Sequence, residues 1–424
     1  MMRRRRPRWS ELQPLLRFRR PILSPTRRRL TRALTITDLR QIARRRTPRS
    51  VFDYTDGAAE AEITIRRARE LFNRLEFSPS VLRDVSNVDL STTMLGLRAE
   101  LPFVFAPTGF TRMMHTAGEP AVARVAQRHG APYTLSTLGT TSIEDVADAA
   151  PTAAKWFQLY VWNDRQAGAE LVRRAEAAGY DALVLTVDAP VAGARLRDSR
   201  NGFTIPPTLT PRTLVDAARH PHWWINLLTT EPLAFASLSS WDGTIAELMN
   251  NLFDPSMTID DLAWLRSIWA GPLIVKGIQS VADARRMADA GIDALVLSNH
   301  GGRQLDRAPT PLRLLPEVVH EVGDQLEVYV DTGVMSGADI IAGLALGARG
   351  VLVGRAYLYG LMAGGESGVE RMTEILTTEM RRTMQLIGAP SVADLRPEHV
   401  LMPTRSEVVA NDACPHSMAR FDKG

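Results

Sequence analysis

The stretch Ala-Gly-Tyr-Asp-Ala-Leu-Val-Leu-Thr at residues 178–186 nearly repeats as Ala-Gly-Ile-Asp-Ala-Leu-Val-Leu-Ser at residues 290–298. Each copy follows a segment rich in Ala and Arg, contains a short apolar run and ends in polar residues. A short run of continuous hydrophobicity suits a strand buried on both faces of a parallel sheet. The repeat therefore predicts helix–strand units in series, with polar side chains where each strand ends.

Extending this pattern outward predicts eight strands. The apolar runs cover residues 101–106, 132–136, 156–161, 182–187, 272–275, 294–297, 328–330 and 351–353. Helix-like segments lie between them, for example at 166–178, 280–290 and 336–346. The expected fold class is α/β, a (β/α)8 TIM barrel with its active site at the carboxyl ends of the strands. A doubly wound open sheet is the alternative, but no GxGxxG turn follows the first run.

The rest of the chain predicts additions to this barrel. Residues 37–46 and 51–72 look helical and, with residues 75–90, suggest an N-terminal helical cap, while 366–388 read as an amphipathic helix. The gap after the fourth run is too long for an ordinary crossover, so we expect a lid insertion at about residues 200–260. The predicted divisions are a basic, disordered arm at 1–34, the barrel at 35–400 and a tail at 401–424.

The charge is distributed unevenly. The chain carries +4 overall, but residues 1–50 contribute +15, from 17 Arg against Glu11 and Asp38, so the remainder carries −11. Residues 1–32 alone carry +11 and lack the apolar core of a secretory signal. Such an arm suits an anionic membrane surface, nucleic acid or a presequence, or it is simply a solvated tail.

Two other compositional features restrict the class of protein. No apolar stretch is long enough to span a bilayer, and the single cysteine, Cys414, leaves no disulfide framework and no thiolate metal site. We therefore expect a cytoplasmic protein without a metal ion. The chain also has 48 Arg but only three Lys, and one of these, Lys276, ends the apolar run at 272–275. A lysine kept in so arginine-rich a chain suggests a chemical role.

The segment Ser-Asn-His-Gly-Gly-Arg-Gln-Leu-Asp at residues 298–306 follows a predicted strand directly. His300 is the side chain best suited to take a proton near neutral pH. Arg303 offers a planar fork that matches a carboxylate. Together they suggest an enzyme that holds an acid by its carboxylate and removes a proton nearby.

Polar residues end the other predicted strands as well, and a barrel would bring them to one mouth. They are Thr108, Ser136, Gln158, Tyr160, Thr186, Asp188, Lys276, Asp331, Gly354 and Arg355. Asp188 could orient His300 and stabilise its cationic form. Arg195 could complete a carboxylate clamp with Arg303. Glycine-containing turns after the seventh and eighth strands match the usual phosphate site of such barrels. The set suggests a hydroxy acid meeting a phosphorylated cofactor.

Several motifs in register strongly resemble the FMN-dependent L-2-hydroxy acid oxidase and dehydrogenase family, most closely the respiratory L-lactate dehydrogenases of bacteria. The resemblance covers roughly residues 35–400. Its motifs are Phe-Asp-Tyr54, Trp156-Phe-Gln-Leu-Tyr160, Leu-Thr-Val-Asp188, Gly193-Ala-Arg-Leu-Arg197, Lys276-Gly-Ile, the segment 298–306 and Val353-Gly-Arg355. Such a set is far more specific than any one of its members.

The resemblance implies a role for each matching residue. His300 would take a proton during oxidation of the Cα–OH carbon, with Asp188 paired to its imidazole. Arg195 and Arg303 would hold the carboxylate, and Tyr54 and Tyr160 would hydrogen-bond the substrate. Lys276 would stabilise reduced FMN near its N1–C2 edge. The other FMN-binding positions implied are Thr108, Gly109, Ser136, Gln158, Thr186, Asp331, Gly333, Gly354 and Arg355.

Three positions depart from family patterns. Met335 stands where many members have an arginine, which predicts weaker FMN binding or binding through Arg355 and backbone amides. Leu138 replaces the tryptophan of plant glycolate oxidases. Gly109 is alanine in some relatives, which bears on oxygen access.

The resemblance implies oxidation of L-lactate to pyruvate, with electrons passing to a membrane quinone. An oxygen-using L-lactate oxidase or monooxygenase, or another L-2-hydroxy acid oxidase, is the nearest alternative. A Schiff-base aldolase built on Lys276 is a rival chemistry, and a nucleic-acid-binding protein acting through its arm is a weaker one. The family implies a homo-oligomer, a tetramer or larger, and the arm suggests a peripheral position on the inner face of the cell membrane.

The predicted lid at 206–257 carries an aromatic and aliphatic cluster. It contains Trp223, Trp224, Ile225, Leu227 and Leu228. This composition suits an interfacial anchor beside the electron acceptor. Packing of the same residues against the barrel or a neighbouring subunit is equally compatible with the sequence.

Overall fold

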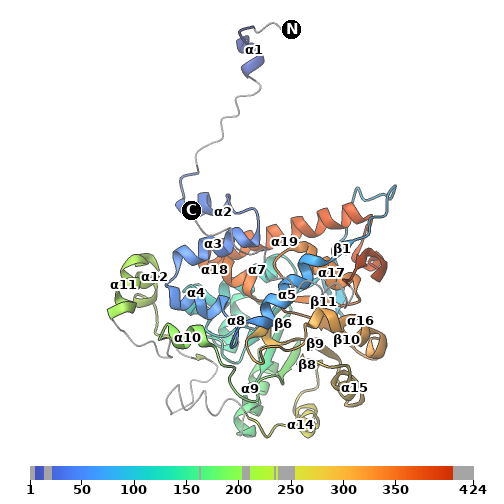
Figure 1. The fold of residues 1–424 in the computed structure, drawn as a ribbon. Coiled ribbons are helices and arrows are strands. Elements are labelled where there is room, and N and C mark those ends of the chain that lie inside the picture. The colour runs from blue at the N-terminus through green and yellow to red at the C-terminus, as the bar shows by residue number, and fades with distance from the viewer. Residues whose placement is uncertain are drawn as a thin grey trace.

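Eight parallel strands close into a barrel in the computed structural model, which describes residues 5–13, 22–161, 164–202, 211–233, 235–236 and 254–403 (Figure 1). In chain order they are β4 (Phe103–Phe105), β5 (Tyr133–Ser136), β6 (Lys155–Leu159), β7 (Ala182–Thr186), β8 (Leu273–Ile278), β9 (Ala294–Leu297), β10 (Glu327–Val330) and β11 (Gly350–Val353). β11 pairs with β4 and closes the ring. Each strand falls on one of the predicted apolar runs, so the (β/α)8 prediction is confirmed.

Helices surround the barrel and follow its strands in turn. They are α7 (Gly118–Arg128), α8 (Ile143–Ala149), α9 (Arg165–Ala177), α14 (Asp260–Ile268), α15 (Val281–Asp289), α16 (Pro311–Val322), α17 (Gly337–Ala345) and α18 (Arg355–Gly364). Ser142, Ser280 and Ser336 begin three of these helices by accepting hydrogen bonds from backbone amides of their first turns. The strands are buried on both faces because one face packs inside the barrel and the other against these helices. Trp156 and Tyr329 fill the inside, edge to face.

The N-terminal cap contains α3 (Ile36–Arg46), α4 (Arg49–Asp56) and α5 (Ile63–Arg74). The helix predicted over 51–72 is therefore interrupted at residues 57–62, where Glu60 and Glu62 have positive φ. The interruption has a physical cause: Ala59 N donates to Gly302 O at 2.8 Å, and Glu60 N donates to Ala194 O at 2.8 Å. The backbone leaves the helical path to bind the loops at the barrel mouth.

Smaller elements complete the cap and the amino-terminal end of the barrel. The sheets are β1 (Glu76–Phe77) with β12 (Val400–Leu401), and β2 (Thr92–Met94) with β3 (Leu97–Ala99). The further helices are α6 (Thr111–Met114), α19 (Glu366–Ile387), and the short 3-10 turns His300–Gly302, Val392–Asp394 and Pro397–His399. α19 matches the amphipathic helix predicted over 366–388.

The basic arm is partly structured, which differs from the prediction for residues 1–34. It includes α1 (Trp9–Leu12) and α2 (Pro25–Leu30), and Leu30 and Ala33 are buried. The Arg371 guanidinium donates to Ala33 O at 2.9 Å. Apolar residues three positions apart thus bind the end of the arm to the helical shell. Of the predicted tail at 401–424, residues 404–424 lie outside the described part of the chain.

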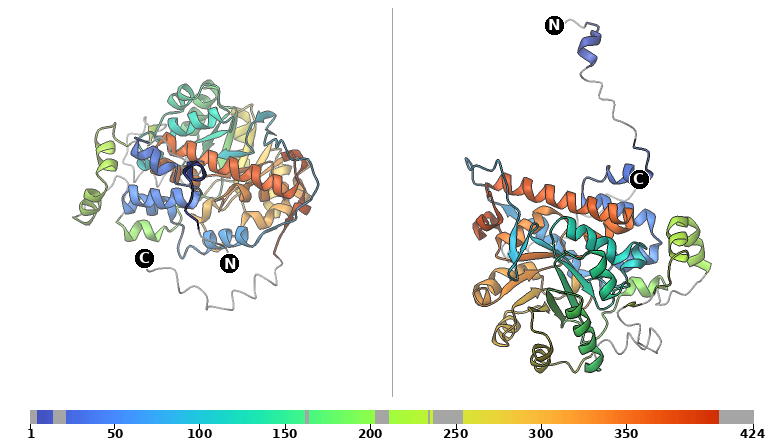
Figure 2. Two further views of the ribbon diagram at one scale, coloured as in Figure 1. Left: turned by 90° about the horizontal axis from the view of Figure 1, so that it is seen from above. Right: turned by 180° about the vertical axis from the view of Figure 1, so that it is seen from behind.

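The insertion after β7 contains α10 (Leu196–Arg200), α11 (Pro211–Arg219) and α12 (Pro221–Leu228). α11 and α12 form a hairpin that projects from the side of the barrel (Figure 2). Residues 203–210, 234 and 237–253 of the predicted lid lie outside the described residues. Among the helices that the structure describes, none is long and apolar enough to cross a membrane.

Candidate active site

A cavity of about 1040 Å³ opens at the carboxyl ends of the strands, beneath α4 and α5. The predicted site residues that line it are Tyr54, Thr108, Gly109, Ser136, Tyr160, Arg195, Lys276, His300, Arg303, Asp331, Gly333, Gly354 and Arg355. Gln158, Thr186 and Asp188 are buried just behind this wall. The structure thus brings together side chains from all parts of the barrel that the sequence had placed at strand ends.

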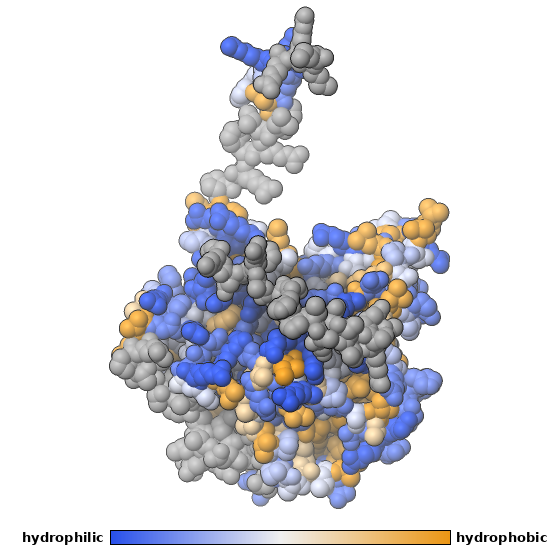
Figure 3. All heavy atoms as spheres, in the orientation of Figure 1, coloured by the Kyte–Doolittle hydropathy of each residue, from blue (hydrophilic) through white to orange (hydrophobic). Residues whose placement is uncertain are grey.

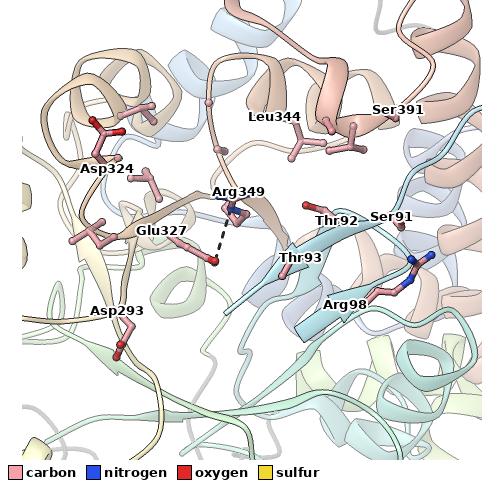
Figure 4. A pocket seen from close by; sticks show the side chains of 18 of the residues that line it. Ser91, Thr92, Thr93, Arg98, Asp293, Asp324, Glu327, Leu344, Arg349 and Ser391 are labelled. Carbon is pink, nitrogen blue, oxygen red and sulfur yellow. Dashed lines mark ion pairs between the residues drawn. The ribbon is translucent and has the colours of Figure 1, made fainter. Parts of the chain in front are cut away.

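A second large cavity, about 910 Å³, lies at the opposite end of the barrel (Figure 4). It is lined by residues at the amino-terminal ends of strands, such as Glu327 and Arg349, whose charged atoms are 3.8 Å apart. The two cavities are similar in size, so size does not identify the active site. The active site is identified instead by the convergence of a histidine, two arginines and a buried lysine on the first cavity.

His300 is paired with Asp188. Its Nδ1 atom lies 3.0 Å from Asp188 Oδ1, which fixes Nδ1 as the protonated nitrogen beside a carboxylate and leaves Nε2 to act as a base. Burial alone would raise the pKa of Asp188, but His300 and Lys276 outweigh it and the pKa is lowered. Asp188 therefore stays ionised and can stabilise an imidazolium.

The loop that carries His300 has an unusual backbone. His300, Gly301 and Gly302 have φ values of 59°, 65° and 73°, and left-handed geometry is uncommon for a histidine. His300 N donates to Ser298 Oγ at 3.0 Å, and Gly302 N donates to Asn299 Oδ1 at 3.0 Å. These bonds hold the turn and aim the imidazole into the cavity.

Lys276 is buried in a polar cluster. Its Nζ donates to Ser298 Oγ at 2.8 Å and lies 3.1 Å from Asp331 Oδ2, while the Ser298 hydroxyl donates to the same carboxylate at 2.8 Å. Burial lowers the pKa of Lys276, but Asp331 and Asp188 outweigh it and the pKa is raised. The lysine is thus held as a cation.

Gly277 makes this arrangement sterically possible. Its φ is +110°, and the pairing of β8 with β9 shifts register between Lys276 and Ile278. A Cβ at Gly277 would lie 2.7 Å from Asp188 Cβ. Only glycine lets this bulge pass so close to the carboxylate.

Two arginines flank one tyrosine at the substrate end of the cavity. The Cζ atoms of Arg303 and Arg195 lie 4.8 Å and 5.4 Å from the centre of the Tyr54 ring. Burial and the charge of Arg195 lower the pKa of Arg303 to about 10. A bound anion would relieve this repulsion, so the pair favours a carboxylate ligand. Burial raises the pKa of Tyr160, which keeps its hydroxyl protonated.

The opposite wall fits a flat heteroaromatic ring. Ser136 Oγ donates to Gln158 Oε1 at 2.9 Å, and Gln158 Nε2 is buried without a hydrogen-bond partner among the described residues. Such a donor calls for a ligand acceptor. A Cβ at Gly109 would lie 2.8 Å from Leu138 Cβ, so the absence of a side chain at Gly109 lets these two parts of the wall pack closely. The hydroxyl of Thr108 is already bonded to that of Tyr357.

The predicted phosphate end contains Gly333, Gly354 and Arg355, and a further cation that was not predicted, Arg69, lines the same cavity. Arg355 donates to Thr55 O at 2.9 Å and Gly57 O at 2.7 Å, so two of its donors are engaged by the end of α4 and the residue that follows it. Beside Met335, the guanidinium of Arg69 donates to Gly333 O at 2.6 Å and pairs with Asp339 at 2.5 Å. Arg69 thus supplies a cation at the turn where Met335 does not.

Sequence reasoning missed three of these residues. Ser298 was within the quoted segment 298–306, and Gly277 follows the strand-end lysine, so both had a local signal. Arg69 had none, because nothing in the sequence of α5 indicates that it reaches the turn after β10.

Comparison with known proteins agrees with this geometry. The profile of the family described as FMN-dependent dehydrogenase matches residues 43–402. A provisionally named L-lactate dehydrogenase of Mycobacterium tuberculosis is 60% identical over 397 residues, 94% of this chain and 96% of that protein. An L-lactate dehydrogenase of Caulobacter vibrioides is 44% identical over 366 residues, 85% of this chain and 95% of that protein.

Solved structures also resemble the chain. A monotopic membrane protein, (S)-mandelate dehydrogenase, superposes with a TM-score of 0.84 at 38% identity, covering 88% of this chain and 100% of that one. A mandelate oxidase variant gives a TM-score of 0.76 at 36% identity, over 88% and 99% of the two chains. The Asp188–His300 pair, the arginine pair and the flavin-compatible wall all lie within the matched region. The chain belongs to the FMN-dependent dehydrogenase family.

Proposed function

We propose that this enzyme oxidises L-lactate to pyruvate and passes the electrons to a quinone in the membrane. The observation that carries the proposal is the meeting of Asp188–His300 with Arg195 and Arg303 in one cavity. The relatives named L-lactate dehydrogenase, at 60% and 44% identity, support the choice of substrate. When bound, FMN supplies the two-electron acceptor.

The roles proposed for the residues follow from their positions. His300 Nε2 takes a proton from the substrate as the Cα–OH carbon is oxidised, and Asp188 stabilises the resulting imidazolium. Arg303 and Arg195 hold the carboxylate, and Tyr54 and Tyr160 donate hydrogen bonds to the substrate. This fixes the reacting carbon against the base, which is the positional part of the rate enhancement.

The residues proposed to hold FMN line the rest of the cavity or lie just behind its wall. Ser136, Gln158 and Thr186 would face the ring, and Lys276 would balance negative charge at its N1–C2 edge. Thr108 and Gly109 would line the ring's other border, while Asp331, Gly333, Gly354 and Arg355 would hold the ribityl phosphate side.

The cationic state of Lys276 disfavours the Schiff-base aldolase. An amine must be neutral to attack a carbonyl, whereas Asp331 and Asp188 raise the pKa of Lys276. Borohydride treatment in the presence of substrate should leave the protein unmodified.

The membrane part of the proposal rests on two surfaces. The first 32 residues carry +11, which attracts an anionic surface. The α11–α12 hairpin exposes Leu214, Val215, Ile225 and Leu228, as expected of an interfacial element. The relative titled a monotopic membrane protein supports this location. A cytoplasmic, peripheral position on the inner face of the membrane and a homo-oligomeric assembly complete the proposal.

The test is anaerobic mixing of the flavin-loaded protein with L-lactate, D-lactate or (S)-mandelate while the visible flavin absorbance is followed. We expect L-lactate to bleach the flavin fastest. Bleaching by none of these acids would overturn the proposed chemistry. Reoxidation by a quinone but slowly by oxygen would support the acceptor, whereas rapid peroxide formation would favour an oxidase.

A further inference from the structure

A separate cavity of about 710 Å³ lies beside the active-site cavity, between α3, α4, α10 and α11. We call it the arginine cavity, because six of the residues that line it are Arg40, Arg44, Arg49, Arg197, Arg200 and Arg219. Three aspartates, Asp53, Asp56 and Asp216, line it too. The imbalance between these two groups gives the cavity a net positive charge.

Two of the aspartates already form ion pairs with three of these arginines. Arg40 pairs with Asp56 at 2.5 Å, Arg49 with Asp53 at 3.3 Å, and Arg197 with Asp56 at 3.1 Å. Arg197 also pairs with Glu62 at 2.5 Å.

The remaining acid does not offset the other arginines. Asp216 accepts a hydrogen bond from Arg49 N at 2.8 Å and lies 3.6 Å from His220 Nδ1. Arg44, Arg200 and Arg219 are exposed, and the described part of the chain holds no ion pair for them. These three guanidinium groups, unpaired among the described residues, could bind an anion from outside the chain.

The α11–α12 hairpin, which lines one side of the arginine cavity, also exposes apolar side chains. α11 contributes Asp216 and Arg219 to the cavity, while its Leu214 and Val215 are 54% and 58% exposed. On α12, Ile225 and Leu228 are 59% and 75% exposed. Figure 3 shows apolar side chains next to strongly hydrophilic surface at the edge where Figure 1 labels α11 and α12.

We propose that the arginine cavity binds the phosphate group of an anionic phospholipid at the base of the α11–α12 hairpin. Guanidinium forks match phosphate oxygens, and an apolar hairpin set into the interface would bring that cavity to headgroup depth. A substrate carboxylate would gain nothing from the apolar hairpin and already has Arg195 and Arg303. The proposal rests on the proposed membrane association and adds the ligand class and the residues that recognise it.

The experiment uses the full-length, flavin-loaded protein and sedimentation with phosphatidylcholine vesicles, with or without phosphatidylglycerol. The test variant combines Arg44→Gln, Arg200→Gln and Arg219→Gln. The matched control combines Arg98→Gln, Arg285→Gln and Arg286→Gln, which removes the same charge from exposed positions on other elements. Both retain the basic arm. Anaerobic flavin reduction by L-lactate reports folding, and we expect it to be unchanged in both.

We expect the test variant to lose about tenfold or more of its partitioning onto phosphatidylglycerol vesicles, and the control to lose about threefold or less. Equal losses in the two variants would overturn the arginine cavity as a site. Saturable binding of inorganic phosphate that the test variant loses while its vesicle binding is intact would instead overturn the phospholipid as the ligand and leave the cavity as a site for free phosphate. Wild-type binding to both vesicle types alike would refute the cavity but leave membrane association standing. Wild-type binding to neither would refute both.

Discussion

Asp188 Oδ1 lies 3.0 Å from His300 Nδ1, and the acid's side chain is 1% exposed whereas the imidazole is 26% exposed. The carboxylate is therefore buried behind the imidazole to which it is hydrogen-bonded. Its other oxygen, Oδ2, is buried without a partner among the described residues. The His300 imidazole and the Lys276 ammonium compensate for the burial of this carboxylate, so the pKa of Asp188 is lowered although burial alone would raise it.

Replacing Asp188 with Asn should leave FMN bound and lower the rate of flavin reduction by L-lactate about 10²–10⁴-fold, the usual size of a general-base contribution. His300→Gln should give a loss of the same order. Stopped-flow absorbance under anaerobic conditions measures both. A wild-type rate in either variant would show that the substituted residue does not take part in general-base catalysis.

The lowered pKa of Asp188 also has a stability consequence. An acid whose pKa is depressed by folding stabilises the fold above its unfolded value of about 3.9, and that contribution is lost as pH falls below it. Urea unfolding should find Asp188→Asn less stable than wild type at neutral pH, with the gap narrowing toward about pH 3. A constant gap would mean that the substitution acts by packing alone.

Arg303→Lys should raise KM for L-lactate and lower kcat. A lysine ammonium cannot reproduce the planar fork that holds a carboxylate in two places. Arg303 also donates to Tyr54 O at 2.5 Å, so lysine would loosen the cap over the substrate. Steady-state kinetics with a quinone acceptor are the measurement, and Arg313→Lys, on α16 outside the cavity, is the control. Unchanged constants would place the carboxylate elsewhere.

Met335→Arg should tighten FMN retention, because it adds a cation beside the glycine turn after β10. Arg69→Gln should weaken retention, since the Arg69 guanidinium is already bonded to Gly333 O at 2.6 Å. Flavin released during dialysis, followed by absorbance, reports both changes without any turnover. If Met335→Arg retains flavin no better than wild type while Arg69→Gln loses it, Arg69 already neutralises this end of the site.

The barrel was predictable from sequence because each strand is a short apolar run with a polar residue at its end, and closure brings those ends together. That logic placed His300, Lys276 and Asp188 in one site. It could not place Arg69, because a long side chain on α5 reaches the barrel only through tertiary packing. It also missed the break in the helix at 57–62, where hydrogen bonds to Gly302 and Ala194 override local helical preference.

The composition of the basic arm did not indicate that α2 packs against the rest of the fold. Removing residues 1–21 should reduce binding to anionic vesicles at low salt and leave thermal stability unchanged. Removing residues 1–32 should in addition lower Tm, because Leu30 is 4% exposed and burying a leucine is worth about 1.5–3 kcal/mol. Vesicle sedimentation and thermal unfolding separate the two effects. Equal Tm values for the two truncations would show that α2 adds nothing to the fold.

Some apolar residues of the α11–α12 hairpin pack against the barrel, and others are exposed. Trp223 is partly buried and its Nε1 donates to Met113 O at 2.9 Å, whereas Leu228 is 75% exposed. Trp223→Ser should therefore destabilise the hairpin, seen as faster proteolysis within it. Ile225→Ser with Leu228→Ser should instead keep the hairpin resistant while weakening vesicle binding and reduction of a long-tailed quinone. Anaerobic flavin reduction by L-lactate should be unaffected in the double variant, because neither residue lines the active-site cavity. Quinone reduction in vesicles at the wild-type rate would show that the acceptor approaches by another face.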